Sequence, residues 1–225
     1  MYSAKVNGEA TTFGTSGLLY RSNKLMYDRA TETIWNQFTG EPVIGPLADS
    51  GTRLEFFPSV VATWSEWLGL HPDTTVLDIE TGVYPSVSYR PEDQPGAPYH
   101  SYFYGTDETM FPVWNSSDAL PNKERVVGVS VGDAHKAYQI EALRNARVVN
   151  DTVGEMDVVI VASSLSEEAR VYRRDGQRFS LASTEGESGP LPAELTDTEG
   201  VVWRVTDDFL VSSTQPSQEL PRVPT

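Results

Sequence analysis

The sequence predicts a mainly β fold of the α+β class, built from duplicated antiparallel β meanders or barrel-like sheets with one or two short packed helices. Short runs of aromatic and β-branched residues alternate with turn residues over most of the chain. Few stretches have helical spacing, and the beginning and end of the chain share a loose repeat. We therefore expect a single domain over residues 1–225, with two copies of one unit at about 1–58 and 156–225.

The first 57 residues are expected to form a meander of short strands. Residue pairs that favour tight turns interrupt their apolar runs: Asn7-Gly8, Thr39-Gly40, Gly45-Pro46 and Ser50-Gly51. A helix over residues 59–70 follows, with Ser59 as its N-cap and His71-Pro72 as its end. Helical spacing gives it one apolar face, which we expect to pack on the sheet: Val60, Trp64, Trp67 and Leu68.

The two copies are linked by this helix, by an aromatic loop and by a hairpin with a helix. Residues 84–114 hold five prolines and many aromatic residues without clean periodicity, so we expect a long loop that packs by its own side chains. Residues 125–149 predict a hairpin that turns at Gly132-Asp133, followed by a short helix at 140–146. Residues 156–162 predict an apolar strand. The polar, Pro-rich tail from Gln215 is expected to be partly mobile.

Charge and composition disfavour several classes of function. The formal charge of -15, from 32 acidic and 17 basic residues, repels phosphate backbones, so we expect no nucleic-acid partner. No apolar run is long enough to span a bilayer, so no transmembrane segment is predicted. The chain has no cysteine, which excludes disulfides and thiolate metal sites within it. Neither a P-loop nor a dinucleotide-binding glycine motif occurs, and no cofactor is predicted.

Metal binding and cellular location receive little support from the sequence. The three histidines, His71, His100 and His135, are far apart and have no spacing typical of a metal site, so no metal is predicted. The first residues do not form a basic segment followed by an apolar one. A cytoplasmic location is expected for the chain as it stands, and an extracytoplasmic one if an N-terminal segment is missing from it.

The repeat also predicts an open sheet edge. The copies share a tyrosine, an Asx-Gly turn and a phenylalanine, which are Tyr2, Asn7-Gly8 and Phe13 in the first and Tyr172, Asp175-Gly176 and Phe179 in the second. A strand at 156–162 precedes the second copy, and a helix follows the first. We therefore expect one strand to be missing before the first copy and one helix after the second. A homodimer partner or a partner strand could cover the resulting edge.

Several motifs resemble those of a known family. They are Phe13-Gly-Thr-Ser-Gly-Leu-Leu-Tyr20, Met26-Tyr-Asp-Arg29, Thr33-Ile-Trp-Asn-Gln37, Thr39-Gly-Glu41, Gly45-Pro46 and Lys123-Glu-Arg-Val-Val-Gly128. By these motifs the chain resembles the domain of unknown function 3179 family over nearly its whole length. The resemblance implies no established reaction. Members usually carry an apolar strand and a Cys-Pro-Leu motif just upstream of where this sequence begins, and many look exported, so it implies no cysteine-dependent role here.

A polar set in the first copy is the main candidate for a ligand site: Tyr27, Asp28, Arg29, Trp35 and Gln37. Asp28 and Trp35 correspond to Asp197 and Trp203, so the alternative for these two is a turn-forming carboxylate and a core indole. Arg29 and Gln37 have no such counterparts. We expect them to hold a small anionic or carbonyl ligand by paired hydrogen bonds, with a structural ion pair such as Arg29 with Glu124 as the alternative.

Four further residues complete the candidate site: Glu124, Arg125, His135 and Tyr102. Glu124 and Arg125 could instead form a structural ion pair. Tyr102 belongs to the run 99–104, which together with Phe111 and Trp114 could form a stacking platform for a sugar or another flat ligand, or could simply pack the loop.

Two functions from different classes follow. The first is a soluble, non-catalytic ligand-binding or assembly module that uses the aromatic loop and the Arg29/Gln37 face. The alternative is a hydrolase or lyase that pairs a carboxylate with His100 or His135. Residues 128–132 match the G-x-S-x-G pattern of a nucleophile elbow, but His135 follows Ser130 too closely for that fold, which favours a strand residue. An enzyme would need such polar groups within hydrogen-bond reach of each other in a concave pocket.

Overall fold

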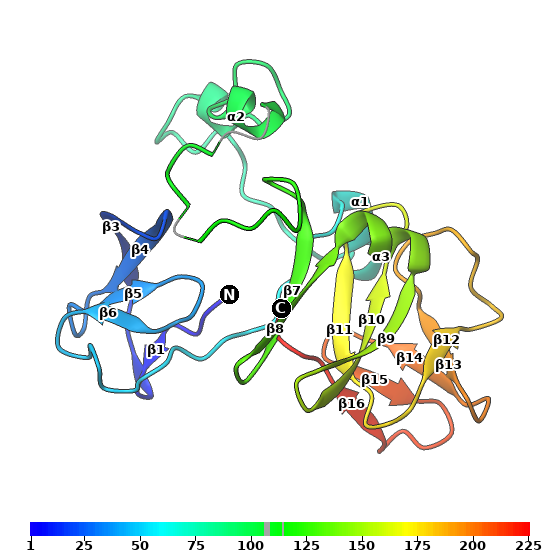
Figure 1. Ribbon diagram of the computed structural model, residues 1–225. Helices are drawn as coiled ribbons and strands as arrows, with labels where there is room; N and C mark the ends of the chain where they lie inside the picture. Colours follow the sequence, from blue (N-terminus) through cyan, green and yellow to red (C-terminus); the bar gives the residue numbers. More distant parts are fainter. Residues whose placement is uncertain (106–108, 114) are drawn as a thin grey trace.

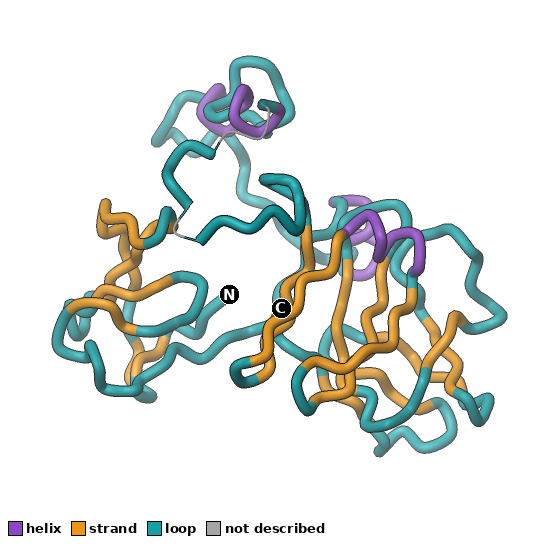
Figure 2. Tube along the Cα trace, viewed as in Figure 1, coloured by secondary structure: helices purple, strands orange, loops and turns teal. Residues whose placement is uncertain are grey.

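The computed structural model describes residues 1–105, 109–113 and 115–225, and it confirms the predicted mainly β fold (Figure 1). All strand pairs among these residues are antiparallel. None of the sheets that they form closes into a barrel, so meanders, and not barrel-like sheets, are the arrangement present. Figure 2 shows that strands dominate both ends of the chain and that the few helices lie between them.

The first unit comprises residues 1–57. A small hairpin, β1 (Lys5–Val6) and β2 (Glu9–Ala10), precedes a four-stranded meander of β3 (Phe13–Tyr20), β4 (Asn23–Asp28), β5 (Ile34–Asn36) and β6 (Pro42–Ile44). Its core is small: among the described residues, Trp35 clusters with two other buried apolar side chains, Val6 and Leu54, and partly buried side chains pack around them. The first unit therefore depends on few contacts for its stability.

The second unit comprises residues 148–223 and has a larger core. A three-stranded sheet of β9 (Val148–Val153), β10 (Met156–Ala162) and β11 (Ala169–Arg173) packs on a five-stranded meander. The meander consists of β12 (Phe179–Leu181), β13 (Glu194–Asp197), β14 (Val202–Val205), β15 (Phe209–Ser212) and β16 (Glu219–Pro221). The expectation of a mobile tail from Gln215 is wrong for β16, because that strand pairs with β15 and buries Leu220.

The two meanders repeat one polar contact. In the first unit the indole nitrogen of Trp35 donates to Asp28 Oδ2 at 2.8 Å. In the second unit the indole nitrogen of Trp203 donates to Asp197 Oδ2 at 2.9 Å. Each aspartate ends a strand, and each tryptophan lies in the next strand of the same meander. The core indole and turn carboxylate that the sequence suggested are therefore present in both units.

The segment between the units holds short helices and one hairpin: α1 (Trp64–Leu70), a 3-10 helix (Ser86–Tyr89), α2 (His100–Tyr104), β7 (Val126–Val131), β8 (Ala134–Gln139) and α3 (Ile140–Ala146). The predicted helix 59–70 begins later than expected. Thr63, and not Ser59, is its N-cap, because the Thr63 side chain accepts from the Glu66 amide and Glu66 bonds back to Thr63. None of its residues is buried, so the expected apolar packing on a sheet is wrong.

The outer edge of the first meander is β3. Within the described residues this strand pairs only with β4, and its last apolar side chains, Leu18, Leu19 and Tyr20, are exposed. Unpaired strand edges of this kind favour pairing with another chain. The homodimer or partner strand expected at an open edge stays a prediction.

Candidate functional site

A cleft of about 720 Å³ lies between the first unit and the β7–β8 hairpin. Figure 1 shows the hairpin standing between the two units, close to both ends of the chain. The first unit forms one wall, with Tyr2, Gln37, Phe38, Thr39, Arg53, Leu54 and Phe56. The hairpin forms the other, with Gly128, Ser130, Gly132, Asp133 and His135, and the tail residues Pro224 and Thr225 line the cleft as well. Volume and mixed lining are typical of ligand sites.

The wall from the first unit combines aromatic surface with an unused amide. The Tyr2 hydroxyl donates to the Gln37 carbonyl oxygen at 2.8 Å, and burial raises the pKa of Tyr2, so this donor stays neutral. The ring of Tyr2 meets that of Phe56 edge to face, with centroids 5.4 Å apart. Phe38 is 79% exposed, and the side-chain amide of Gln37 has no partner among the described residues. This wall therefore offers flat apolar surface beside a free donor and acceptor.

The wall from the hairpin carries a serine–histidine pair. Ser130 lies directly opposite His135 in the β7–β8 register, and His135 Nδ1 is 3.0 Å from Ser130 Oγ. The two-residue turn at Gly132-Asp133 sets this pairing, because it makes 130 and 135 a cross-strand pair on one face. Both residues are exposed, and His135 has no carboxylate partner within the described chain. Ser130 lies inside a strand and not at a strand-to-helix turn.

Two of the predicted site residues, Asp28 and Trp35, are fully buried in the first unit. Asp28 also accepts from the backbone and the hydroxyl of Thr31, both at 2.6 Å. Burial opposes ionisation, but these hydrogen bonds outweigh it and lower the pKa of Asp28. Both residues thus have structural contacts, and neither lines the cleft.

Arg29 and Tyr27 lie elsewhere on the first unit. The Arg29 guanidinium donates to the Phe13 carbonyl oxygen at 2.9 Å and to Thr12 Oγ1 at 3.3 Å, and it lies 5.2 Å from the centroid of the Tyr27 ring. In the second unit the residue that corresponds to Phe13 is Phe179. Its backbone carbonyl and amide form hydrogen bonds with the side-chain amide of Asn150, from β9. Arg29 therefore satisfies a carbonyl group at the edge strand β3. The suggested ion pair with Glu124 is not formed.

The remaining predicted residues lie apart from the cleft. Glu124 and Arg125 line a second cavity of about 630 Å³ beside α3, where Arg125 forms an ion pair with Glu167 and not with Glu124. Tyr102 lies in α2, where the Lys123 ammonium is 4.0 Å from its ring centroid and donates to its carbonyl oxygen. Trp114, one member of the suggested stacking platform, lies outside the described residues. Of the nine predicted residues, the cleft unites Gln37 and His135.

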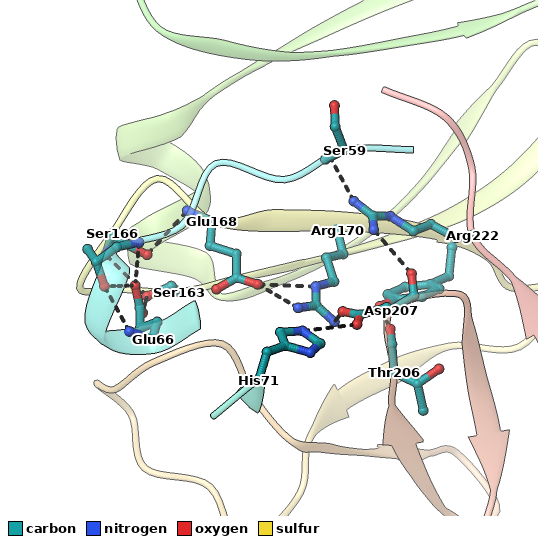
Figure 3. A network of polar contacts seen from close by, with 12 residues as sticks. Ser59, Glu66, His71, Ser163, Ser166, Glu168, Arg170, Thr206, Asp207 and Arg222 are labelled. Atoms are coloured by element: carbon teal, nitrogen blue, oxygen red, sulfur yellow. Dashed lines mark hydrogen bonds and ion pairs between the residues drawn. The ribbon is translucent and has the colours of Figure 1, made fainter. Parts of the chain in front are cut away.

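A second polar cluster, which we call the clasp, fastens α1 to the second unit (Figure 3). Glu66 uses one carboxylate oxygen to cap α1 through Thr63 and accepts from Ser163 Oγ at 3.0 Å with the other. Ser163 is fully buried in the turn between β10 and β11, and its hydroxyl oxygen also accepts hydrogen bonds from the backbone amides of Leu165 and Ser166. Burial opposes ionisation of Glu66, but its hydrogen bonds outweigh that effect and lower its pKa. The Glu66 side chain therefore both caps α1 and attaches this helix to the second unit.

The other part of the clasp is a chain of charges around Arg170. This side chain is 3% exposed, donates to the buried Glu168 at 2.7 Å and bonds Asp207 Oδ1 at 2.8 Å. His71 Nε2, at the end of α1, is 3.3 Å from Asp207 Oδ2, which is an ion-pair distance, although the angles do not make a hydrogen bond. Arg222 donates to the carbonyl oxygens of Asp207 and Ser59 at 3.1 and 2.9 Å.

Most of the clasp has no signal in the sequence. Ser163, Glu168 and Arg170 follow an apolar strand and read as an ordinary polar turn, because their partners lie far away in sequence. Only the Thr63–Glu66 spacing, which is that of a capping box, could have located the start of α1 and singled out Glu66. Within the described part of the chain, the histidine that meets a carboxylate is His71, and not His100 or His135.

The described residues contain no group of three or more His, Asp or Glu side chains placed to hold a metal ion. None of the helices in this part of the chain combines the length and apolar character that crossing a bilayer requires.

Comparison with known protein families yields a match over almost the whole chain. A family model described as "Protein of unknown function (DUF3179)" matches residues 1–224. No curated protein and no solved structure matches the chain.

Proposed function

We propose a function for this chain, which belongs to the DUF3179 family of proteins of unknown function. It is a non-catalytic binding module whose ligand occupies the cleft. One observation carries the proposal: Gln37 and His135, 98 positions apart in sequence, line the same cavity of about 720 Å³. The ligand class that matches the lining has a flat apolar part for Tyr2, Phe38 and Phe56 and hydrogen-bonding groups for the amide of Gln37 and the imidazole of His135.

Binding is favoured over catalysis by the surroundings of His135. A general base is normally oriented by a third group and shielded from water, and His135 is exposed and has no carboxylate partner within the described residues. The 3.0 Å contact between His135 Nδ1 and Ser130 Oγ nevertheless supports a hydrolase as the second candidate. A fluorophosphonate probe separates the two, since only an activated Ser130 would be labelled and S130A would abolish the label.

The binding proposal is tested by amide NMR shifts and thermal stability with a panel of sugars, carboxylates, nucleosides and aromatic peptides. We expect at least one class to shift amides of the cleft and to raise the melting temperature. Gln37→Ala and His135→Ala should weaken that response, while Arg29→Ala, outside the cleft, should not. If no class perturbs the cleft, or if the shifts cluster around Arg29, the proposal is wrong.

The internal duplication also stays a proposal, and the paired contacts of the two meanders support it. The carboxylate–indole bond occurs at the same place in both. The backbone amide of each aspartate also donates to a carbonyl oxygen a few residues on, that of Thr33 for Asp28 and that of Val201 for Asp197. By this pairing, residues 1–57 correspond to the part of the second unit that begins in β11. Equilibrium unfolding of the full chain tests whether the two copies are separate folding units, because units with cores of different size should unfold in separable steps, the first unit at the lower urea concentration.

A further inference from the structure

The two units end in the same way. In the first, Tyr2 forms an isolated bridge with Phe56, and the Phe57 amide donates to the Met1 carbonyl oxygen at 2.8 Å. In the second, Tyr172 bridges Arg222, and the Val223 amide donates to the Val171 carbonyl oxygen at 2.7 Å. Both closing strands are then followed by a proline, Pro58 or Pro224. The register is therefore identical, with Tyr2 matching Tyr172 and Phe56 matching Arg222.

The tyrosines also contact matching turns. The Tyr2 hydroxyl donates to the carbonyl oxygen of Gln37, and the Tyr172 hydroxyl donates to that of Thr206 at 2.5 Å. Gln37 and Thr206 each follow the strand that carries the buried tryptophan of their unit. Each unit thus has one face made of a tyrosine, a closing-strand residue and this turn.

In the second unit this face is covered by a peptide segment of the same chain. Residues 59–71 lie across it, with the Ser59 carbonyl oxygen on Arg222 and His71 beside Asp207 (Figure 3). The segment holds α1, and the face is charged where the segment touches it.

In the first unit the matching face is one wall of the cleft. Tyr2, Phe56 and Gln37 all line the cavity, and Phe38 stands beside them. Among the described residues, only the hairpin and the tail residues Pro224 and Thr225 approach this wall. The wall is aromatic where the second unit is charged, because Phe56 takes the place of Arg222. An occupant of the first face should therefore contribute apolar contacts at Phe56 and Phe38, although Arg53 and Asp133 line the cavity as well.

We propose that the cleft is a docking site for a short amphipathic helical peptide of a partner protein, with the chemistry of residues 59–71 and with tryptophan or leucine side chains directed at Phe38 and Phe56. This inference rests on the proposed function and names its ligand class. A peptide is chosen because the matching face of the same molecule carries one. A helical groove ligand of this kind is anchored by a few large apolar side chains spaced along one face.

The test is a fluorescence-anisotropy titration of the full chain into a labelled synthetic peptide of residues 59–71, which keeps the Thr63–Glu66 capping box. We expect saturable binding. Phe38→Ala should weaken it by about tenfold, as for an apolar anchor, and should not disturb folding because Phe38 is 79% exposed. Tyr84→Ala, at a residue 65% exposed and outside the cleft, is the matched control and should bind like the parent. A peptide with alanine at both tryptophan positions should bind at least about tenfold more weakly.

Three results would overturn the inference: no saturable binding up to millimolar peptide, equal binding by the alanine peptide, or binding that is unchanged in Phe38→Ala but altered in Asp207→Ala. The last result would mean that the peptide displaces α1 from the second unit. Failure here is distinguishable from failure of the proposed function. If small ligands still shift amides of the cleft, the cleft remains a binding site, and only the peptide is ruled out as its ligand.

Discussion

Asp28→Asn is the substitution that tests most directly what holds the first unit together. Asp28 is fully buried, and its Oδ2 accepts both the indole of Trp35 and the hydroxyl of Thr31. An amide nitrogen at the Oδ2 position cannot accept either bond, and the turned amide would instead place its nitrogen against the Thr31 backbone N–H that Oδ1 accepts. Hydrogen bonds to a charged acceptor contribute about 1.5–3 kcal/mol, and a buried donor left unpaired costs about 1–3 kcal/mol. Because the Thr31 hydroxyl can rotate to another partner and the indole cannot, we expect a loss of about 3–4 kcal/mol.

The matched control is Asp197→Asn in the second unit. Asp197 makes the corresponding bond to Trp203 at 2.9 Å but is only partly buried, so water can replace some of the lost contacts. We expect a loss of about 1–2 kcal/mol there. Urea unfolding followed by tryptophan fluorescence measures both. A loss below about 1 kcal/mol for Asp28→Asn, or one no larger than that of Asp197→Asn, would refute the reasoning.

The comparison of the parent protein with Asp28→Asn also predicts a pH dependence. The pKa of Asp28 is lowered in the folded state, so its contribution to stability is complete above the unfolded value of about 3.9 and is lost as the pH falls through the folded value. The difference in unfolding free energy between the two proteins should therefore be constant from about pH 7 to about pH 5 and should shrink below about pH 4. A difference that grows in acid would contradict the assignment.

Three further predictions concern the clasp and Tyr172, which interacts electrostatically with Arg170 of the clasp. Arg170→Met leaves the carboxylate of Glu168 buried and unpaired, so the free energy of unfolding should fall by about 3–5 kcal/mol. The double variant that also carries Glu168→Leu should recover most of that loss in the same urea assay. Glu66→Gln weakens both the cap of α1 and its contact with Ser163, so the free energy of unfolding should fall by about 1–2 kcal/mol. Chymotrypsin should also cleave faster after Trp64 or Trp67 within α1, and an unchanged cleavage rate would mean that other contacts hold the helix. Burial raises the pKa of Tyr172 to about 12, against the opposing effect of Arg170. Because the pKa of Tyr172 is raised in the folded state, the contribution of Tyr172 to stability is present below its unfolded pKa of about 10 and is lost as the pH rises through the folded value. Tyr172→Phe should therefore flatten the fall in stability above about pH 10. An unchanged slope would contradict this.

Local sequence predicted those parts of the site that depend on short spacings. The turn at Gly132-Asp133 set the hairpin register and with it the contact between Ser130 and His135. Comparison of the copies also singled out Gln37 by its side chain, since the matching turn of the second unit has Thr206. Arg29 satisfied the same criterion but caps the edge strand β3, because a guanidinium group can satisfy a backbone carbonyl as well as a ligand.

The sequence by itself determined the β-rich class, the family resemblance, and the positions of the two turn aspartates and their buried tryptophans, since turn residues and alternating apolar runs act over a few positions. Only the tertiary structure decided which distant residues meet: Gln37 with His135 across the cleft, and Glu66 with Ser163, 97 positions on, in the clasp. The physical reason is that such contacts depend on how the long segment between the units places α1 and the hairpin. No local spacing encodes that placement.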